Sequence, residues 1–233
     1  MLRELIKEIN SKKNIEKARI YRRFFKTGKG EYGEGDIFIG LSMLEQRKIA
    51  KKFINLGFDD IGKLLYSKYH EYRMIGFIII VYKFENSNDI ERKYIVNFYL
   101  ENISQANNWD LIDCVCDKIL GKWLIDKDKN LLYEFSKSEN LWKRRIAIIS
   151  TFYFIKNNKF NYSLDISKIL LNDKHDLIHK AVGWMLREIG KRDKEILKEF
   201  LKKYYRQMPR TMLRYAIEKF KEDERKKYLN GKI

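Results

Sequence analysis

The chain has very little proline and cysteine. Its only proline among 233 residues is Pro209, so almost nothing in the sequence breaks a helix by removing a backbone donor. The two cysteines, Cys114 and Cys116, are two residues apart and fall on different helix faces, which excludes a disulfide framework and a zinc knuckle. A reducing, cytoplasmic compartment is therefore expected.

Signals for a membrane or for secretion are also missing. The longest apolar run, from Met74 to Tyr82, is far shorter than the roughly 20 residues that cross a bilayer. The chain begins with an amphipathic pattern containing Glu4 and Glu8 instead of the apolar segment of a signal peptide. We expect no membrane partner.

Acidic residues are outnumbered by basic ones. Lysine and arginine total 49 against 32 aspartate and glutamate residues, which gives a net charge of +17. This balance favours a polyanionic partner, most simply a nucleic acid. The alternative explanation is a genome composition that enriches lysine, isoleucine and asparagine.

What the sequence has in abundance is helical periodicity. Apolar residues recur every three or four positions, beginning with Leu2, Leu5, Ile6 and Ile9. The segment 75–81 has β propensity, but its glycine and the helical segments on both sides favour a buried helix. Further helices are predicted over residues 43–56, 58–68, 70–85, 88–104, 108–123, 127–137, 140–157, 162–172, 174–190, 193–205 and 209–229.

Most of these helices pair into units of the length typical of helical repeats. Stacked helix pairs form a solenoid with a concave face, and a basic concave face suits a nucleic-acid duplex better than a small substrate. No linker or shift in composition divides the chain, so one all-α domain over residues 1–233 is predicted.

A glycine-dense loop at residues 28–36 contains the spacing GxGxxG. No strand precedes it and no βαβ unit surrounds it, so the dinucleotide-binding interpretation fails its structural context. Two interpretations stay open: a loop that brings the backbone close to a phosphate chain, and a plain linker between helices.

The clearest candidate for chemistry lies near the middle of the chain. Asn108 is a predicted N-cap, Trp109 is then the first helical residue, and Asp113 lies one turn later on the same face. We expect the positive end of the helix dipole to favour an ionised Asp113. An indole beside a carboxylate suits a flat, cationic ligand. Asp110, the neighbouring acid, is assigned to the helix start.

Two downstream clusters repeat the combination of tryptophan and a charged residue. Trp142 is followed three residues later by Arg145, and Trp184 by Arg187. Arg145 is suited to hold a phosphate near the acid. Gly183 removes a side chain in mid-helix, which indicates close packing or close approach. A lone tryptophan usually packs in a core, but three such clusters favour a functional site.

The histidines give no comparable signal. His175 and His179 are four residues apart, but the second position of an HExxH motif is Asp176 and no third ligand is evident. No metal is therefore predicted. His70 stands alone, and no Ser-His-Asp or Cys-His arrangement can be argued.

These segments resemble the AlkD-type DNA alkylation repair glycosylases. The resemblance lies in residues 108–113, 141–147 and 180–188, and residues 23–40 are similar to a branch of that family. It covers nearly the whole chain, in order and at the expected intervals.

The resemblance implies one domain of HEAT-like helical repeats that cups duplex DNA. It implies hydrolysis of the N-glycosidic bond of N3- or N7-alkylated purines without a metal or cofactor. The expected partner is double-stranded DNA that carries alkylated purines, bound by a monomer in the cytoplasm, at the nucleoid if the source is prokaryotic.

Residue by residue, the resemblance places the catalytic carboxylate at Asp113, the lesion-site tryptophans at Trp109 and Trp184, and a DNA-backbone arginine at Arg145. Arg187 matches another arginine of the motif. Phe24 is aligned with a DNA-contacting aromatic residue that is often tyrosine in the family, so a hydroxyl contact is lost here.

Two other classes compete with a glycosylase. A non-catalytic helical-repeat protein that binds DNA structures or another protein needs the basic face but not an ionised Asp113. An RNA-binding repeat protein would need a one-base-per-repeat code, which the sequence does not show.

Overall fold

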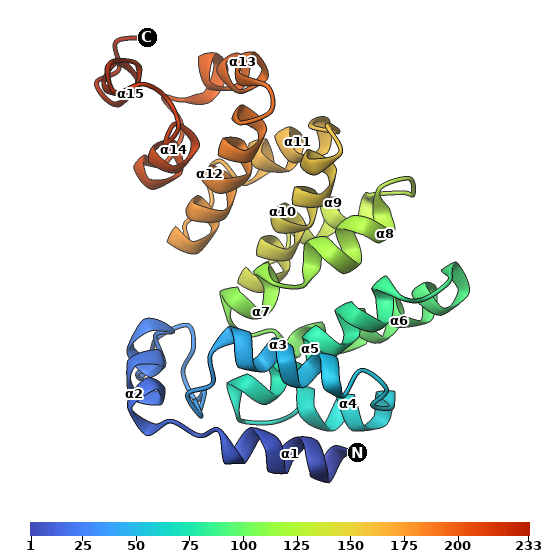
Figure 1. Ribbon diagram of the computed structural model, residues 1–233. Helices are drawn as coiled ribbons and strands as arrows, with labels where there is room; N and C mark the ends of the chain where they lie inside the picture. Colours follow the sequence, from blue (N-terminus) through green and yellow to red (C-terminus); the bar gives the residue numbers. More distant parts are fainter. The chain divides into compact units, whose positions relative to one another are not determined.

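Helices make up the secondary structure, as the periodicity predicts. In the computed structural model, which describes residues 1–233, no strand forms, and the only β contact is an isolated parallel bridge between Ile37 and Tyr69. The chain divides into two units, Met1–Val115 and Cys116–Ile233, which we describe separately (Figure 1). The all-helical prediction is confirmed, and a single domain stays a prediction. No helix is both long enough and apolar enough to cross a bilayer.

Unit 1 is built around α5, against which α3, α4 and α6 pack (Figure 1). All of the α5 residues from position 70 to 81 are buried. The β propensity of 75–81 thus reflects burial on every side, and the helix predicted there is confirmed. The helices of this unit are α1 (Leu2–Ser11), α2 (Ile15–Phe24), α3 (Met43–Lys52), α4 (Phe58–Leu65), α5 (His70–Glu85), α6 (Asp89–Glu101) and α7 (Trp109–Asp113), with a 3-10 turn η1 (Ile103–Gln105).

Unit 2 is built around α10 and α12. The segments α9, α11 and η2 pack on α10, while α13 and α14 pack on α12. This stacking of neighbouring helices agrees with a helical-repeat fold. The elements are the π-helical turn η2 (Asp117–Gly121), α8 (Lys122–Leu124), α9 (Asn130–Ser136), α10 (Leu141–Lys156), α11 (Asn161–Ile169), α12 (Asp176–Gly190), α13 (Lys194–Tyr204), α14 (Arg210–Ala216) and α15 (Glu222–Leu229).

Local capping explains where several helices begin. In α3 and α6, Ser42 and Asn88 accept a hydrogen bond from the backbone of Glu45 and Glu91, whose carboxylates bond back to the cap residues. These capping boxes satisfy amide groups that have no partner inside the helix. Asn140 caps α10 without a capping box, by accepting hydrogen bonds from two backbone amides.

Two predicted helices are interrupted. The helix expected over 108–123 ends at Asp113, and the chain resumes as the π-helical turn before α8. The helix expected over 209–229 stops after α14, and a new helix starts at Glu222. Neither break contains proline. The second is marked by three acidic residues in the first turn of α15, a pattern that favours a helix N-terminus.

Glycine at position 183 has the packing role that the sequence indicates. A Cβ atom there would lie 2.5 Å from the backbone oxygen of Met212 and 2.5 Å from the Cβ of Tyr215. Gly183 therefore allows α12 to lie close to α14. Gly121 does the same in η2, where a Cβ would lie 2.3 Å from the backbone oxygen of Ser150.

We expect Gly183→Ala to destabilise unit 2 by about 2 kcal/mol, because the added methyl overpacks the contact with α14. Urea denaturation measures this change. The matched variant is Gly62→Ala in α4, where an added Cβ meets no atom within 4 Å. That variant should be neutral or more stable by up to about 1 kcal/mol. Equal stability of the two variants would contradict the packing role.

Candidate functional site

Helix α7 presents two of the predicted site residues. Asn108 caps it, with Oδ1 accepting from the Trp109 amide at 2.9 Å, so the predicted cap and first residue are confirmed. The helix has only five residues, however, and Asp113 is the last of them. The expected support of Asp113 by the positive end of the dipole is therefore wrong, since that end lies at Asp110.

A buried histidine connects Asp110 to the glycine loop. His70 Nδ1 lies 2.9 Å from Asp36 Oδ2, and His70 Nε2 lies 2.8 Å from Asp110 Oδ2. The three side chains are almost completely buried. A protonated imidazole donates from both nitrogens, so it satisfies one carboxylate on each side.

Arg73, one turn after His70 in α5, extends this network. Its Nη2 donates to Asp36 Oδ1 at 2.6 Å and to Asn107 Oδ1 at 2.9 Å. Asn107 in turn donates from Nδ2 to Asp36 Oδ1 at 2.9 Å. The glycine loop, α5 and the turn before α7 are therefore joined by charged hydrogen bonds, which are stronger than neutral ones.

The charges of the network stabilise one another. Burial disfavours the imidazolium, but the carboxylates of Asp110 and Asp36 outweigh it and raise the pKa of His70 to about 9. Burial also opposes ionisation of Asp36, yet its bond to His70 and the charge of Arg73 keep its pKa below the ordinary value. At neutral pH the imidazole is charged and lies between two carboxylates.

A third buried carboxylate, that of Glu71, holds the segment that follows the glycine loop. Glu71 accepts hydrogen bonds from the backbone amides of Ile39, Gly40 and Leu41, at distances from 2.7 to 3.3 Å. Gly40 has a φ of 93°, and a Cβ there would lie 2.1 Å from the backbone oxygen of Asn14. Only glycine fits this position.

Aromatic rings join the network to Trp109. Phe38 stacks on His70 with centroids 4.4 Å apart, and Phe25 stacks on Phe38 at 5.0 Å. Phe25 also stacks on Trp109 at 5.2 Å, with an interplanar angle of 23°. Phe24 meets Trp109 edge-on at 5.7 Å. The structure thus brings together the predicted residues Phe24 and Trp109, and their rings pack beside the buried histidine.

The glycine loop packs against the end of α2 and the cap of α7. Gly33 is buried, and a Cβ there would lie 2.5 Å from the backbone oxygen of Phe25 and 3.0 Å from Asn108 Nδ2. Asn108 donates to that same Phe25 oxygen at 3.3 Å. The loop ends at Asp36 in the buried network, so it is a structural element of the α7 support.

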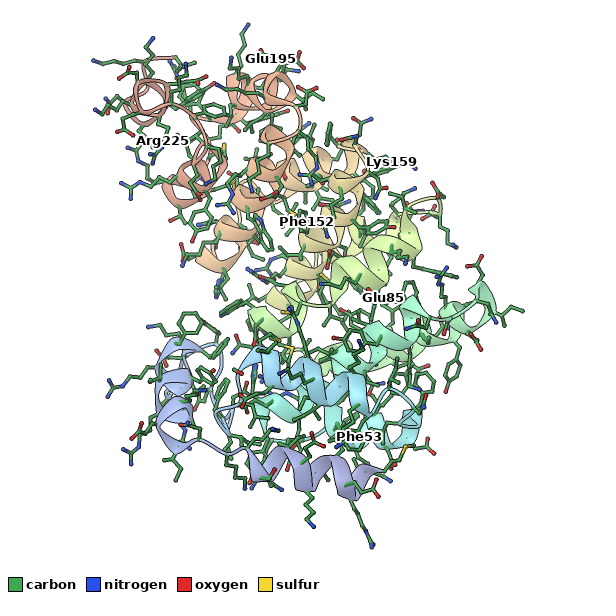
Figure 2. All side chains as sticks on the ribbon, in the orientation of Figure 1. Phe53, Glu85, Phe152, Lys159, Glu195 and Arg225 are labelled. Atoms are coloured by element: carbon green, nitrogen blue, oxygen red, sulfur yellow. The ribbon has the colours of Figure 1, made fainter.

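In unit 2, Trp184 is half-buried on α12. Phe152, labelled on α10 in Figure 2, has its ring centroid 5.5 Å from that of Trp184. Arg187 of the same helix forms an ion pair with Glu218. Trp184 therefore packs against α10, while Arg187 is paired with a carboxylate in the turn that follows α14.

The second predicted arginine of unit 2 is largely buried. Arg145 is 5% exposed, and its Nη1 donates to the backbone oxygen of Leu177 at 2.5 Å. That bond ties α10 to the first turn of α12. The expected contact between Arg145 and a DNA phosphate stays a prediction. The guanidinium already donates a hydrogen bond to the Leu177 oxygen.

The paired histidines belong to the beginning of α12. His175 caps the helix, with Nδ1 accepting from the Leu177 amide at 3.1 Å. His179 Nε2 lies 2.5 Å from the backbone oxygen of Asp173. The chain contains no cluster of three or more side chains suited to hold a metal ion.

Comparison with known proteins gives a family. The family described as DNA alkylation repair enzyme matches residues 5–220. The chain belongs to this DNA alkylation repair enzyme family. A solved structure described as a predicted DNA alkylation repair enzyme from Enterococcus faecalis has the same fold. Its TM-score is 0.70, with 16% identity over 90% of this chain and 97% of that one.

One similarity lies outside this family. The chain is 26% identical to a valine–tRNA ligase of Ureaplasma parvum serovar 3 over 110 residues, which are 45% of this chain. The chain spans 12% of the length of that ligase. A match of this extent carries no conclusion about the activity of a DNA alkylation repair family member.

For this DNA alkylation repair family member, the sequence motifs predict site residues on α7 and α12 but give no indication of the residues that hold α7 in place. In the sequence His70 stands alone, because its partners Asp36 and Asp110 are 34 and 40 residues away. Arg73 and Glu71 carried no motif. The usable signal was one acid and two basic residues, Glu71, His70 and Arg73, at the start of an otherwise apolar helix.

The network predicts an unusual charge state for His70. We expect nuclear magnetic resonance at pH 7.5 to show a protonated His70 imidazole, because its folded pKa is about 9. His175 is the internal control: burial lowers its pKa below the ordinary 6.5, so it should be neutral at the same pH.

The raised pKa of His70 also determines how the stability of the fold changes with pH. A group whose folded pKa is raised stabilises the fold fully below its ordinary value of 6.5 and loses that contribution as pH rises through about 9. Stability should therefore fall over this interval in wild type and change less in His70→Gln. A neutral His70 at pH 7.5 would contradict the ion network.

Proposed function

We propose that this chain is a DNA N-glycosylase that hydrolyses the N-glycosidic bond of cationic N3- or N7-alkylated purines in duplex DNA. The observation that carries the proposal is Trp109 and Asp113 on one short helix whose start is held by a buried ion network, within a DNA alkylation repair family member. Family membership supports alkylation damage in DNA as the substrate class. Helix α7 supports hydrolysis of the glycosidic bond, because it carries an indole and a carboxylate.

The main catalytic requirement of this reaction is stabilisation of the positive charge that develops on the sugar. An alkylated purine is positively charged and is a good leaving group, so bond breaking chiefly needs help at the sugar, which becomes oxocarbenium-like. An ionised Asp113 about 4 Å from that charge, at an effective dielectric near 20, contributes roughly 4 kcal/mol, or about a thousandfold in rate. The same carboxylate is suited to orient the attacking water.

Trp109 suits the cationic base. Its ring is held by stacking on Phe25 and by the edge contact with Phe24, so little rotamer freedom is lost when a ligand binds. An indole attracts a positively charged ring through its face. We assign Trp184 the same kind of contact, and Arg145 and Arg187 a role toward the DNA backbone. The mechanism uses no metal or cofactor.

We expect Asp113→Asn to bind methylated duplex DNA like the wild type but to release base about a thousandfold more slowly, because the amide cannot stabilise the sugar cation. The measurement is release of 7-methylguanine and 3-methyladenine under single-turnover conditions. Circular dichroism should show an unchanged fold, since asparagine has nearly the same shape as aspartate.

The matched control is Asp89→Asn, which removes a carboxylate that is 84% exposed in α6. It should release base at the wild-type rate. Wild-type release by Asp113→Asn would remove Asp113 from the mechanism. If the wild type bound DNA but released no base, the non-catalytic DNA-binding alternative would be favoured.

Binding to undamaged duplex DNA should be strongly electrostatic. The net charge of +17 predicts that several phosphates are neutralised and counterions released. We expect affinity to fall by about a thousandfold between 50 and 200 mM salt, measured by fluorescence anisotropy. A flat salt response would argue against a surface that follows the phosphate backbone.

A further inference from the structure

A groove in unit 1 lies between the loop before α4, the end of α5 and the start of α6 (Figure 1). Its volume of about 460 Å³ falls within the roughly 300–1,000 Å³ typical of ligand pockets. The groove shares no lining residue with the support of α7 or with the glycine loop. We name this space the α6 groove. Its apolar walls are formed by Ile54, Phe58, Ile90, Tyr94 and Ile95.

The walls of the α6 groove leave apolar surface in contact with water. Ile90 is 85% exposed and Tyr94 is 56% exposed. Tyr94 packs edge-on against Phe58, with ring centroids 4.9 Å apart, so the aromatic wall is held in place. Single exposed apolar residues are ordinary, but apolar residues that gather along one groove mark an interaction surface.

One cation lies in this apolar setting without a carboxylate partner. Lys83 is the only lysine or arginine that lines the groove, and its Nζ lies 5.4 Å from the centroid of the Phe58 ring. Burial holds the pKa of Lys83 below its ordinary value, and no neighbouring carboxylate opposes this shift. An anion placed beside the ammonium would therefore be stabilised by a charge that the protein itself leaves unpaired.

Three other polar side chains of the groove already have structural roles. Asn86 and Ser87 donate to the backbone oxygens of Tyr82 and Lys83, and so they close the end of α5. Glu91 accepts from the backbone amide of the α6 cap residue. Its negative charge also makes the groove unsuited to a ligand with several anionic groups. The lining therefore suits one negative charge joined to an apolar group.

The C-terminal residue of a protein has this combination. Its carboxylate and its side chain share one Cα atom, so the carboxylate can pair with Lys83 while an apolar side chain packs against Phe58 and Ile90. An aspartate or glutamate inside a chain has its charge at the end of the side chain and brings no apolar group of its own. Capture of a terminal carboxylate is a recurring way to recognise a peptide, and a charged hydrogen bond strengthens it.

We propose that the α6 groove binds the C-terminal residue of a partner protein, with the terminal carboxylate on Lys83 and an apolar or aromatic side chain against Phe58 and Ile90. This interaction goes beyond the proposed glycosylase activity and does not rest on it, since no residue of the groove has a role in that reaction. Unit 1 then has a docking surface for a protein in addition to the helix that carries Trp109 and Asp113.

The test uses fluorescence anisotropy with a fluorescein-labelled peptide of glycine and serine that ends in leucine and phenylalanine. Saturable binding is expected for the free acid. The same peptide with a C-terminal amide should bind at least about tenfold more weakly, because it has no charge to pair with Lys83. Equal affinity of acid and amide would overturn the recognition of a carboxylate.

A substitution of the lysine locates the charge. Lys83→Met keeps a long apolar side chain but removes the ammonium, so it should bind the free acid no better than the amide. The matched control is Lys93→Met, which removes an exposed lysine of α6 that lines no cavity. This control should bind both peptides like the wild type.

A second substitution tests the apolar wall. Ile90→Ser should weaken binding of the free acid about fivefold, because less apolar surface is buried against the terminal side chain. Its matched control is Ile15→Ser, since Ile15 also lies in the first turn of a helix, is 73% exposed and lines no cavity. Equal affinities of these two variants would overturn the assigned wall.

Absence of saturable binding by the wild type, or wild-type affinity in Lys83→Met, would overturn the docking site. Loss of duplex DNA binding in Lys83→Met, with peptide binding unchanged, would instead assign the ammonium to the phosphate backbone. Base release from methylated DNA should be the same in Lys83→Met and wild type. Failure of peptide binding is therefore distinguishable from failure of the proposed glycosylase activity, which depends on Asp113.

Discussion

The buried imidazolium between Asp36 and Asp110 is the constraint on which unit 1 depends. Taking charges out of water is costly, and the cost is offset only when every charge is paired and hydrogen-bonded. His70 and Arg73 meet this condition only if the glycine loop, α5 and the turn before α7 adopt one arrangement. Removal of one partner would leave an uncompensated buried charge, so these groups specify a single geometry rather than simply adding stability.

That geometry matters because α7 cannot hold itself in place. A five-residue helix is far shorter than the roughly 12 residues at which an isolated helix becomes marginally stable. Its position is set by the Asn108 cap, by the bond from Asp110 to His70, and by the stacking of Trp109 on Phe25. Asp113 is then placed by the helix geometry, three residues beyond a fixed carboxylate. Trp109 and Asp113, to which we assign roles in the proposed reaction, are thus carried by α7, while their positions are determined by α5 and the glycine loop.

Features that depend on residues close together in the sequence could be predicted, and features that depend on residues far apart could not. Apolar periodicity and capping residues act within a few positions, so the buried α5 helix, the Asn108 cap and the packing role of Gly183 were predictable. The partners of His70 are more than thirty residues away and share no motif with it. The end of α7 at Asp113 also escaped prediction, because no proline or glycine marks it and the apolar pattern continues past it. Tertiary contacts override local propensity at such positions.

Motif spacing identifies basic residues without showing whether they are available to a phosphate. Arg145 is almost fully buried and bonds to the backbone at the start of α12, and Arg187 pairs with Glu218. Both arginines therefore help to position α12, which carries Trp184, and any contact with DNA has to add to these bonds or replace them. Arg19 and Arg23 are exposed and lack carboxylate partners, so their charge is open to solvent and to an approaching anion. Long-range attraction to DNA is consequently expected from exposed cations of this kind. Arg145 and Arg187 instead hold α12 in position against its neighbouring segments.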